Sequence, residues 1–205
     1  MTLLDLHNQI NKELNENPNL ITDKGGMHEY IERFYNDEFT PKKLDNVTIV
    51  EIGVWNGGSM ELFGKWFENG KIIGIDNFSQ VSHDMIDSLK SRINNINNVE
   101  LIIGNGYHDN IINQFKDESI DYLIDDGSHI IENQIDCIKK YYPKIKKGGK
   151  IIIEDILDID RNKVKFDELN LPYQLFDLRF ITMDFHNPTI GAQHLHNNVL
   201  AIFKK

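Results

Sequence analysis

Residues 47–59 read VTIVEIGVWNGGS and determine the class of fold. Residues 47–53 are rich in β-branched side chains and end in an acid and a glycine, which is typical of a short buried strand. The glycines that follow allow a tight turn and let a ligand approach the backbone closely. A helix-like stretch begins at residue 59, and the free N–H groups at its start would suit a carboxylate or a phosphate. This strand–turn–helix order predicts an α/β domain with a ligand site at the turn.

The same rhythm repeats along the chain. Further strand-like runs are KIIGID (71–76), VELIIG (99–104), DYLIDD (121–126) and KIIIED (150–155), and the helix-like stretches between strands are 59–68, 81–94, 107–116 and 130–142. Strands that alternate with helices predict βαβ units and a parallel sheet. Because the crossovers of such units are right-handed, we expect helices on both faces of the sheet.

The C-terminal part predicts two more strands, at 173–180 and 197–205, which we expect to form a hairpin-like antiparallel pair at the sheet edge. The predicted fold is therefore a Rossmann-like, doubly wound α/β layer sandwich. Its sheet is seven-stranded and mostly parallel, with an antiparallel C-terminal edge strand. Residues 3–15 and 27–39 read as helices that precede the first strand.

Composition limits the classes of partner. The chain has 205 residues, of which 40% are hydrophobic, enough for the core of one compact domain. Its net charge of −10 argues against nucleic acid as a partner, and the lysine-rich run 139–150 is more typical of a solvated helix end and turn. No run reaches the roughly 18 apolar residues of a membrane span. A single cysteine, Cys137, and the lack of a signal-like N-terminus predict a soluble, cytoplasmic protein.

Acids and glycines recur at one end of the predicted strands. In open α/β sheets the carboxyl ends of the strands form the ligand crevice. Acids buried there without a partner would be costly, so their recurrence indicates a polar ligand or a cation. The residues in question are Glu51, Gly53, Asp76, Gly104, Asp125, Asp126, Glu154 and Asp155.

The glycine-rich turn does not have the spacing of a dinucleotide site. Its pattern is G-x-x-x-G-G from Gly53 to Gly58, whereas the dinucleotide fingerprint is G-x-G-x-x-G, which disfavours a nicotinamide oxidoreductase. Asp76 ends the second strand and could accept hydrogen bonds from ribose hydroxyls. A turn that binds nothing is the plain alternative, and the presence of both Glu51 and Asp76 weakens it.

These residues resemble a known family. EIGVWNGGS (51–59) followed by GID (74–76) resembles the first two motifs of class I S-adenosylmethionine-dependent methyltransferases. DDGSH (125–129) and GGKIIIED (148–155) resemble motifs of the metal-dependent sugar O-methyltransferases, which act on macrolide-attached deoxysugars, rhamnosyl groups and nucleotide sugars. The segment TDKGGMHEY (22–30) resembles their upstream element. The resemblance covers residues 21–205 and is specific for the family, not for the acceptor.

The resemblance implies a set of residues that bind S-adenosylmethionine. Glu51 and Gly53 would line the methionyl part, Asp76 would hold the ribose, and Asn77 would lie next to the adenine. At Asn105 many relatives carry an acid near the adenine amino group, and an asparagine can still form that hydrogen bond. The full set is Glu51, Gly53, Gly57, Gly58, Ser59, Asp76, Asn77, Asn105 and Asp125.

Three carboxylates form a candidate metal site. Asp126, Glu154 and Asp155 end two predicted strands, and adjacent strands would bring them close together. Such carboxylates repel one another unless they are protonated or bind a cation. Oxygen ligands favour Mg²⁺, with Ca²⁺ or Mn²⁺ open. The plain alternative is that Glu154 and Asp155 cap the following segment while Asp126 makes a turn.

His129 is the candidate general base, because a free imidazole with a pKa of about 6.5 can accept a proton at neutral pH. The alternative is a helix-start histidine that faces water. Lys24, His28 and Tyr30 are candidates for a lid over the cofactor or acceptor, with plain solvent exposure as the alternative. The loop histidines His186, His194 and His196 have no zinc-like spacing, and their loop could either face the acceptor or be a plain surface loop.

The expected function is an S-adenosylmethionine-dependent O-methyltransferase of a sugar or glycoside, which includes nucleotide sugars. A metal would chelate the small-molecule acceptor. Residues 1–45 would form an N-terminal helical cap or lid, and residues 46–205 the catalytic domain. The alternatives are a metal-dependent methyltransferase of a catechol-like molecule and a cofactor-binding protein without catalysis. The sequence leaves the acceptor, the metal and a homo-oligomeric state open.

Overall fold

The computed structural model describes residues 1–13, 22–25, 28–179 and 197–205. They divide into two compact units, Met1–Gly104 and Asn105–Lys205. The strand order is β3-β2-β1-β4-β5-β7-β6, in one seven-stranded sheet. The first three of these strands belong to the first unit and the other four to the second. This order, with antiparallel pairing confined to the C-terminal strands, confirms the predicted α/β class.

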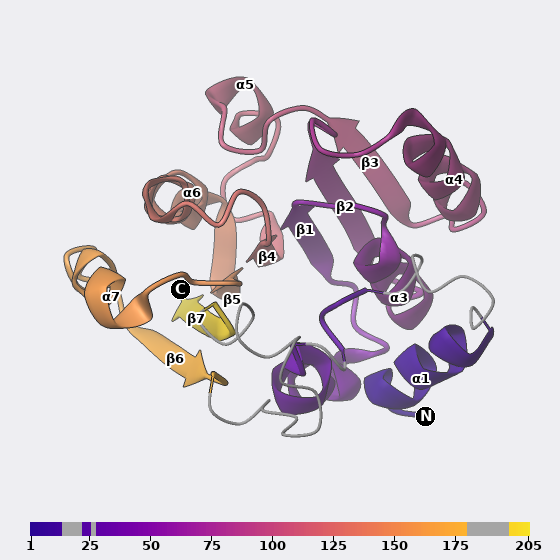
Figure 1. Cartoon of the computed structure of the whole chain (residues 1–205), viewed down its shortest axis with the longest axis horizontal. Helices are drawn as coiled ribbons and strands as arrows, with labels where there is room; N and C mark the ends of the chain where they lie inside the picture. Colours follow the sequence, from indigo (N-terminus) through magenta and orange to yellow (C-terminus); the bar gives the residue numbers. More distant parts are fainter. Residues whose placement is uncertain (14–21, 26–27, 180–196) are drawn as a thin grey trace. The chain divides into compact units, whose positions relative to one another are not determined.

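The first unit contains a three-stranded parallel sheet (Figure 1). β2 (Lys71–Asp76) lies between β1 (Thr48–Ile52) and β3 (Val99–Ile103). Helices α3 (Gly58–Trp66) and α4 (His83–Ile93) lie between consecutive strands, as the βαβ pattern predicted. Most residues of β1 and β2 are buried, which explains why these strands read as continuous apolar runs.

Helical segments precede β1, where the sequence predicted one helix over 3–15 and another over 27–39. After the first of these segments, the winding changes from π to α to 3-10 along residues 31–42. A set of aromatic rings joins them to α3: Phe39 packs edge-on against Phe63 at 5.4 Å, and Trp66 Nε1 donates to the Phe39 carbonyl at 3.1 Å. The segments are α1 (Leu3–Glu13), η2 (Ile31–Tyr35), α2 (Asn36–Phe39) and η3 (Thr40–Lys42).

The second unit contains the remaining four strands. β4 (Ile120–Asp125) and β5 (Ile145–Ile153) are parallel, whereas β7 (Val199–Lys204) pairs antiparallel with both β5 and β6 (Tyr173–Asp177). The predicted antiparallel pair is confirmed, with β6 rather than the C-terminal strand β7 outermost. The helices of this unit are α5 (Asp109–Ile112), α6 (Ile131–Tyr141), η4 (Tyr142–Lys144) and α7 (Ile159–Asp167).

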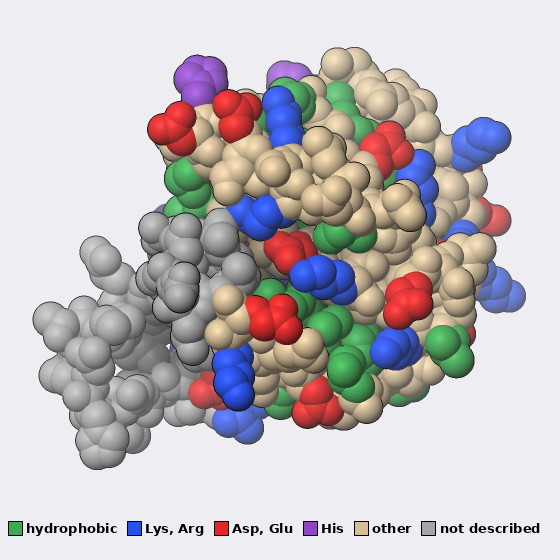
Figure 2. Space-filling model, turned by 90° about the vertical axis from the view of Figure 1, so that its right-hand side faces the viewer, with side chains coloured by type: hydrophobic (Ala, Val, Ile, Leu, Met, Phe, Trp, Pro, Cys, Tyr) green, Lys and Arg blue, Asp and Glu red, His purple; other side chains and the backbone are tan. Residues whose placement is uncertain are grey.

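The predicted cap of residues 1–45 stays a prediction, because the helical segments before β1 fall in the same compact unit as β1, β2 and β3. None of the helices in the described part of the chain combines the length and the apolar composition that a membrane crossing requires. Acidic and basic side chains are interspersed over the face shown in Figure 2.

Candidate functional site

The glycine-rich turn after β1 has the backbone that its sequence suggested. Gly53 and Gly57 have φ values of 89° and 80°, and Gly57 is the residue before the first turn of α3. A Cβ atom at Gly57 would lie 1.9 Å from Leu89 Cδ1, so no larger residue fits without displacement. The exposed Trp55 between the two glycines is also left-handed, with φ 49°. Gly58 and Ser59 begin α3 directly after this turn.

Glu51, at the end of β1, is fully buried and paired. Its Oε2 accepts a hydrogen bond from the Ser59 hydroxyl at 2.7 Å, and its Oε1 lies 3.3 Å from Lys24 Nζ. Lys24 is itself only 1% exposed. The structure thus brings together two predicted donor-binding residues, Glu51 and Ser59, with a residue predicted for the lid.

Asp76 uses its carboxylate to fix the turns after β1 and β2. Its Oδ2 accepts from the backbone N–H groups of Val54 at 2.7 Å and Trp55 at 3.0 Å, and its Oδ1 accepts from Phe78 at 2.6 Å. An ionised carboxylate offers about four acceptor positions, so capacity for a further hydrogen bond remains. The neighbouring Asn77 is exposed, and its Oδ1 accepts from the backbone of Ser79.

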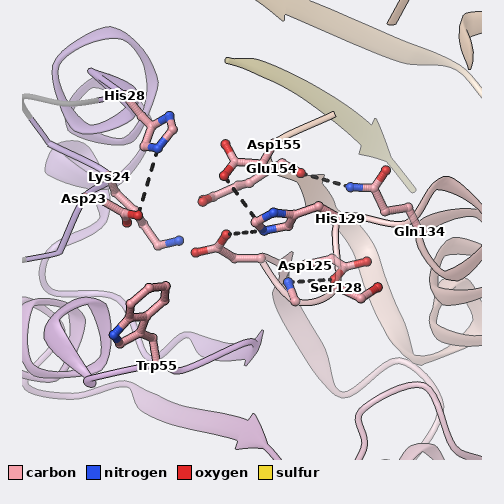
Figure 3. A network of polar contacts seen from close by, with 12 residues as sticks. Asp23, Lys24, His28, Trp55, Asp125, Ser128, His129, Gln134, Glu154 and Asp155 are labelled. Carbon is pink, nitrogen blue, oxygen red and sulfur yellow. Dashed lines mark hydrogen bonds and ion pairs between the residues drawn. The ribbon is translucent and has the colours of Figure 1, made fainter. Parts of the chain in front are cut away.

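The three residues predicted for a lid, Lys24, His28 and Tyr30, are buried. His28 and Tyr30 are 4% and 1% exposed, and their rings stack at 5.2 Å. His28 Nε2 lies 3.9 Å from Asp23 Oδ2 (Figure 3). Solvent exposure, the alternative for Lys24, His28 and Tyr30, therefore does not hold, while a lid role stays a prediction.

In the second unit, three side chains converge near the ends of β4 and β5. His129 Nε2 lies 3.2 Å from Asp126 Oδ1 and 3.8 Å from Asp155 Oδ2 (Figure 3). One ligand atom from each of the three lies within 4.8 Å of the other two. His129 is therefore tied to carboxylates and is not a helix-start histidine that simply faces water.

Glu154, the third predicted metal ligand, does not join this group of described side chains. It is 1% exposed, its N–H donates to the Asp125 carbonyl, and its own carbonyl accepts from Gln134 Nε2 at 3.0 Å. Successive residues of an extended chain point to opposite sides, so two consecutive carboxylates do not readily share a site. The left-handed Asp155, with φ 52°, is the one that approaches Asp126 and His129.

Electrostatics at His129 oppose loss of its proton. Burial alone lowers the pKa of His129, but the hydrogen bond to Asp126 and the charges of Asp126, Asp155 and Asp125 outweigh it and raise the pKa to about 9. The imidazole therefore holds a proton at neutral pH for as long as both neighbouring carboxylates are free. A cation that neutralises these carboxylates would reverse this bias.

Asp125 lies at the centre of a buried polar network that the sequence did not predict. Burial raises the pKa of Asp125 to about 6, although hydrogen bonds from the Tyr107 hydroxyl at 2.7 Å and the Gly127 backbone oppose the shift. Asn105 Oδ1 accepts from the Tyr107 backbone at 3.0 Å, so this predicted cofactor residue shapes the same loop. The sequence signal for Tyr107 was weak: a hydroxyl-bearing aromatic residue two positions after Asn105. His186, His194 and His196 lie outside the described residues.

The two units present different chemistry. The first offers a glycine-rich turn beside carboxylates that can accept hydrogen bonds from a polar ligand. The second offers two carboxylates, which are hard ligands that can hold a divalent cation, and an imidazole that can move a proton.

Comparisons with known proteins show the family of the chain. Residues 50–156, just over half of the chain, match the family described as Methyltransferase domain. A relative from Streptomyces olivaceus, 8-demethyl-8-alpha-L-rhamnosyl tetracenomycin-C 2'-O-methyltransferase, is 28% identical over 66% of the chain and 35% of its own length. Mycinamicin VI 2''-O-methyltransferase from Micromonospora griseorubida is 29% identical over 66% of the chain and 33% of its own length. The chain thus spans about a third of these relatives.

Solved structures share the fold. MycE methyltransferase from the mycinamycin biosynthetic pathway, in complex with Mg, SAH and mycinamycin VI, aligns over 100% of the chain and 54% of its own, with a TM-score of 0.63 and 19% identity. An rRNA methylase from Streptococcus thermophilus aligns over 82% of the chain and 92% of its own, with a TM-score of 0.56 and 16% identity. At these identities the likeness shows a shared fold alone.

Proposed function

Because the chain belongs to the Methyltransferase domain family, we propose that it transfers the methyl group of S-adenosylmethionine to a hydroxyl of a sugar-like acceptor. The observation that carries the proposal is the convergence of Asp126, His129 and Asp155. A sugar hydroxyl is a poor nucleophile, and this group combines a proton acceptor with ligands for an activating cation.

Donor binding is assigned to the residues around the glycine-rich turn. The free N–H groups at the start of α3 suit the methionyl carboxylate. Glu51 is a candidate partner for the methionyl ammonium, and Asp76 has acceptor capacity left for a ribose hydroxyl. The family resemblance implies a place beside the adenine for Asn77 and Asn105, and a place on the cofactor side for Asp125.

The residues present fit a divalent cation. Mg²⁺ is commonly held by one or two carboxylates, with water and substrate oxygens in the other positions. Asp126 and Asp155 supply two such carboxylates, and Glu154 stays a predicted third ligand. When bound, the cation would neutralise these carboxylates and lower the pKa of a coordinated acceptor hydroxyl. His129 and Asp155 are both left-handed, a strain that persists where the surrounding structure enforces it and that is concentrated at functional sites.

His129 is assigned the base role. Its Nε2 would take the proton of the acceptor hydroxyl as the oxygen attacks the methyl carbon of the sulfonium. The new bond is C–O, the broken bond is C–S, and the electron pair of the broken bond stays on sulfur, which leaves as a neutral thioether. The proton on His129 is then released to solvent. Because Mg²⁺ prefers oxygen ligands, the imidazole is free for this role.

The acceptor class rests on the relatives. The relatives from Streptomyces olivaceus and Micromonospora griseorubida have names that describe O-methylation of a tetracenomycin rhamnosyl group and of mycinamicin VI. Since the chain spans about a third of their length, the acceptor here is proposed only as sugar-like.

The test is transfer of a labelled methyl group in a panel of glycosides, nucleotide sugars and catechols, each with EDTA and with added Mg²⁺. We expect labelled glycosides or nucleotide sugars with Mg²⁺ and none with EDTA. Label on catechols but on no sugar would reject the sugar acceptor. Tight donor binding without transfer to any acceptor, under any divalent cation, would reject the enzymatic function.

A further inference from the structure

The hydroxyl of Tyr107 sits inside the turn that carries the candidate metal ligand and base. It donates to Asp125 Oδ1 at 2.7 Å and accepts from the backbone N–H of Ser128 at 3.0 Å. Asp126 lies between these two contacts in the chain, and His129 follows directly after the second. One phenol oxygen thus links both ends of the turn.

Tyr107 is itself held in place. Its backbone N–H donates to Asn105 Oδ1 at 3.0 Å, and its carbonyl accepts from Lys140 Nζ at 3.2 Å. Lys140, on α6, also lies 2.9 Å from a carboxylate oxygen of Asp109 and 2.9 Å from one of Asp136. The ring therefore presents its hydroxyl to the turn from a fixed backbone position.

The turn needs such support because His129 is in the left-handed region, with φ 54°. A left-handed conformation is strained for a residue other than glycine, and its surroundings must offset that strain. The Ser128 hydroxyl accepts from Asn133 Nδ2 at 2.9 Å, so the side chain of Ser128 is fixed from α6 while its backbone is fixed by Tyr107. Together these contacts hold the residue that precedes the strained position.

We propose that Tyr107 is a positioning residue of the candidate metal site, whose hydroxyl holds Asp125 and Ser128 so that Asp126 and His129 face Asp155. The inference rests on the metal-binding part of the proposed function. Tyr107→Phe removes one oxygen atom, takes a donor from Asp125 and leaves the Ser128 N–H without its acceptor. The turn then has less to oppose its backbone strain, and the ligand geometry loosens.

The test is direct binding of Mn²⁺, as a stand-in for Mg²⁺, to the whole chain without donor or acceptor. Binding is measured from the electron paramagnetic resonance signal of the Mn²⁺ that stays free. Outer contacts that orient metal ligands change metal affinity by about 10–100-fold. We expect Tyr107→Phe to weaken Mn²⁺ binding by about tenfold or more. Should the variant be partly unfolded, the shift of its urea midpoint with Mn²⁺ concentration gives the same dissociation constant.

Tyr141→Phe is the matched control. Tyr141 is buried, and its hydroxyl donates to the Gly106 carbonyl at 2.9 Å, which lies outside the turn. Tyr141→Phe loses the same atom and a comparable hydrogen bond as Tyr107→Phe. We therefore expect a similar loss of stability in the two variants, but a Mn²⁺ affinity of Tyr141→Phe within about twofold of the wild type. Equal weakening in both variants would show a general structural effect and overturn the positioning role.

The outcomes separate this inference from the proposed function. Mn²⁺ binding by the wild type together with unchanged binding by Tyr107→Phe overturns the role of Tyr107 alone. No Mn²⁺ binding by the wild type overturns the metal-binding part of the proposed function, and the role of Tyr107 with it.

Discussion

Replacement of Lys24 by methionine should destabilise the protein far more than the loss of an ordinary ion pair. The side chains of Lys24 and Glu51 are 2% and 0% exposed, with 3.3 Å between Nζ and Oε1. Methionine keeps much of the apolar volume but removes the cation beside a buried carboxylate. Loss of one partner of a buried pair costs about 3–5 kcal/mol, because the remaining charge stays desolvated.

The assay is urea unfolding monitored by circular dichroism. The dependence of the unfolding free energy on urea concentration must be equal in the variants that are compared. For a chain of this size, 3–5 kcal/mol corresponds to a fall in Tm of roughly 6–20 °C. Lys65→Met is the matched control in the same unit. Lys65 lies 2.6 Å from Glu61 but is 40% exposed, and Arg92 also contacts Glu61 at 3.2 Å. Its loss should cost less than about 1 kcal/mol.

A double-mutant cycle isolates the charge effect. Glu51→Gln removes the charge that Lys24→Met leaves behind, so the double variant should be more stable than Lys24→Met alone by about 2 kcal/mol. The reasoning is refuted if Lys24→Met costs no more than Lys65→Met, or if the two substitutions at positions 24 and 51 are additive. Because the measured quantity is unfolding free energy, the result does not depend on any role of Glu51 in donor binding.

Three further predictions concern the proposed sites. Asp155→Ala should abolish Mg²⁺-dependent methyl transfer and leave donor affinity, measured by calorimetry, within about threefold of the wild type. In EDTA, the pKa of His129 is about 9 in the folded protein and therefore exceeds its unfolded value of about 6.5. This difference contributes up to about 3 kcal/mol to the free energy of unfolding. The contribution is fully present below pH 6.5 and is lost as pH rises through 9. Urea unfolding at both pH values, with His129→Gln as the insensitive reference, checks this. Gly57→Ala should lower the free energy of unfolding by at least about 1 kcal/mol more than Gly148→Ala. Both glycines are left-handed, but only Gly57 lies against Leu89. Equal urea midpoints for the two variants would contradict the overlap.

Strand positions could be predicted from the sequence because buried parallel strands are continuous apolar runs. β1 and β2 fall where VTIVEIG and KIIGID predicted them. β5 begins earlier than predicted, at Ile145, and its pairing with β4 shifts between Ile120 and Tyr122, so residues 146–149 form an irregularity within the strand. Lysines and glycines are typical of a solvated turn, and pairing with a neighbouring strand is a tertiary effect that no local pattern reveals.

The helices predicted over 27–39 and 107–116 agree less well with the structure than the strands do. The spacing of apolar residues in 27–39 indicated one α-helix, whereas the structure winds residues 31–42 as π, α and 3-10 turns in succession. Apolar spacing reports which side of a segment is buried and is insensitive to small changes in winding. The predicted helix 107–116 is reduced to α5, and its first residues serve instead as the loop that presents Tyr107.

The candidate site shows the same limit at the level of single residues. Proximity in the sequence treated Glu154 and Asp155 as equivalent ligands, but only Asp155 reaches Asp126 and His129. The choice between the two depends on the left-handed backbone at Asp155, which a sequence without glycine at that position does not reveal. Likewise, the burial of Lys24 depends on a distant partner, Glu51, on β1.

Backbone strain in this protein is concentrated where strands end. Among the described residues, eight non-glycine residues have positive φ, and four of them follow closely after β1, β2, β4 and β5. Each costs about 1–2 kcal/mol unless local contacts enforce the conformation. The four are Trp55, Phe78, His129 and Asp155.

The compensating contacts differ between the units but follow one principle. In the first unit, the half-buried Asp76 carboxylate accepts the N–H groups of both Trp55 and Phe78, so one side chain holds two strained residues. In the second unit, the Tyr107 hydroxyl accepts the N–H that precedes His129. In both units one polar side chain that accepts backbone N–H groups fixes a loop at the end of a strand. Strand ends built in this way have a defined backbone conformation from which side chains can be presented to a ligand, and a defined geometry is what transfer of a group between two bound reactants requires.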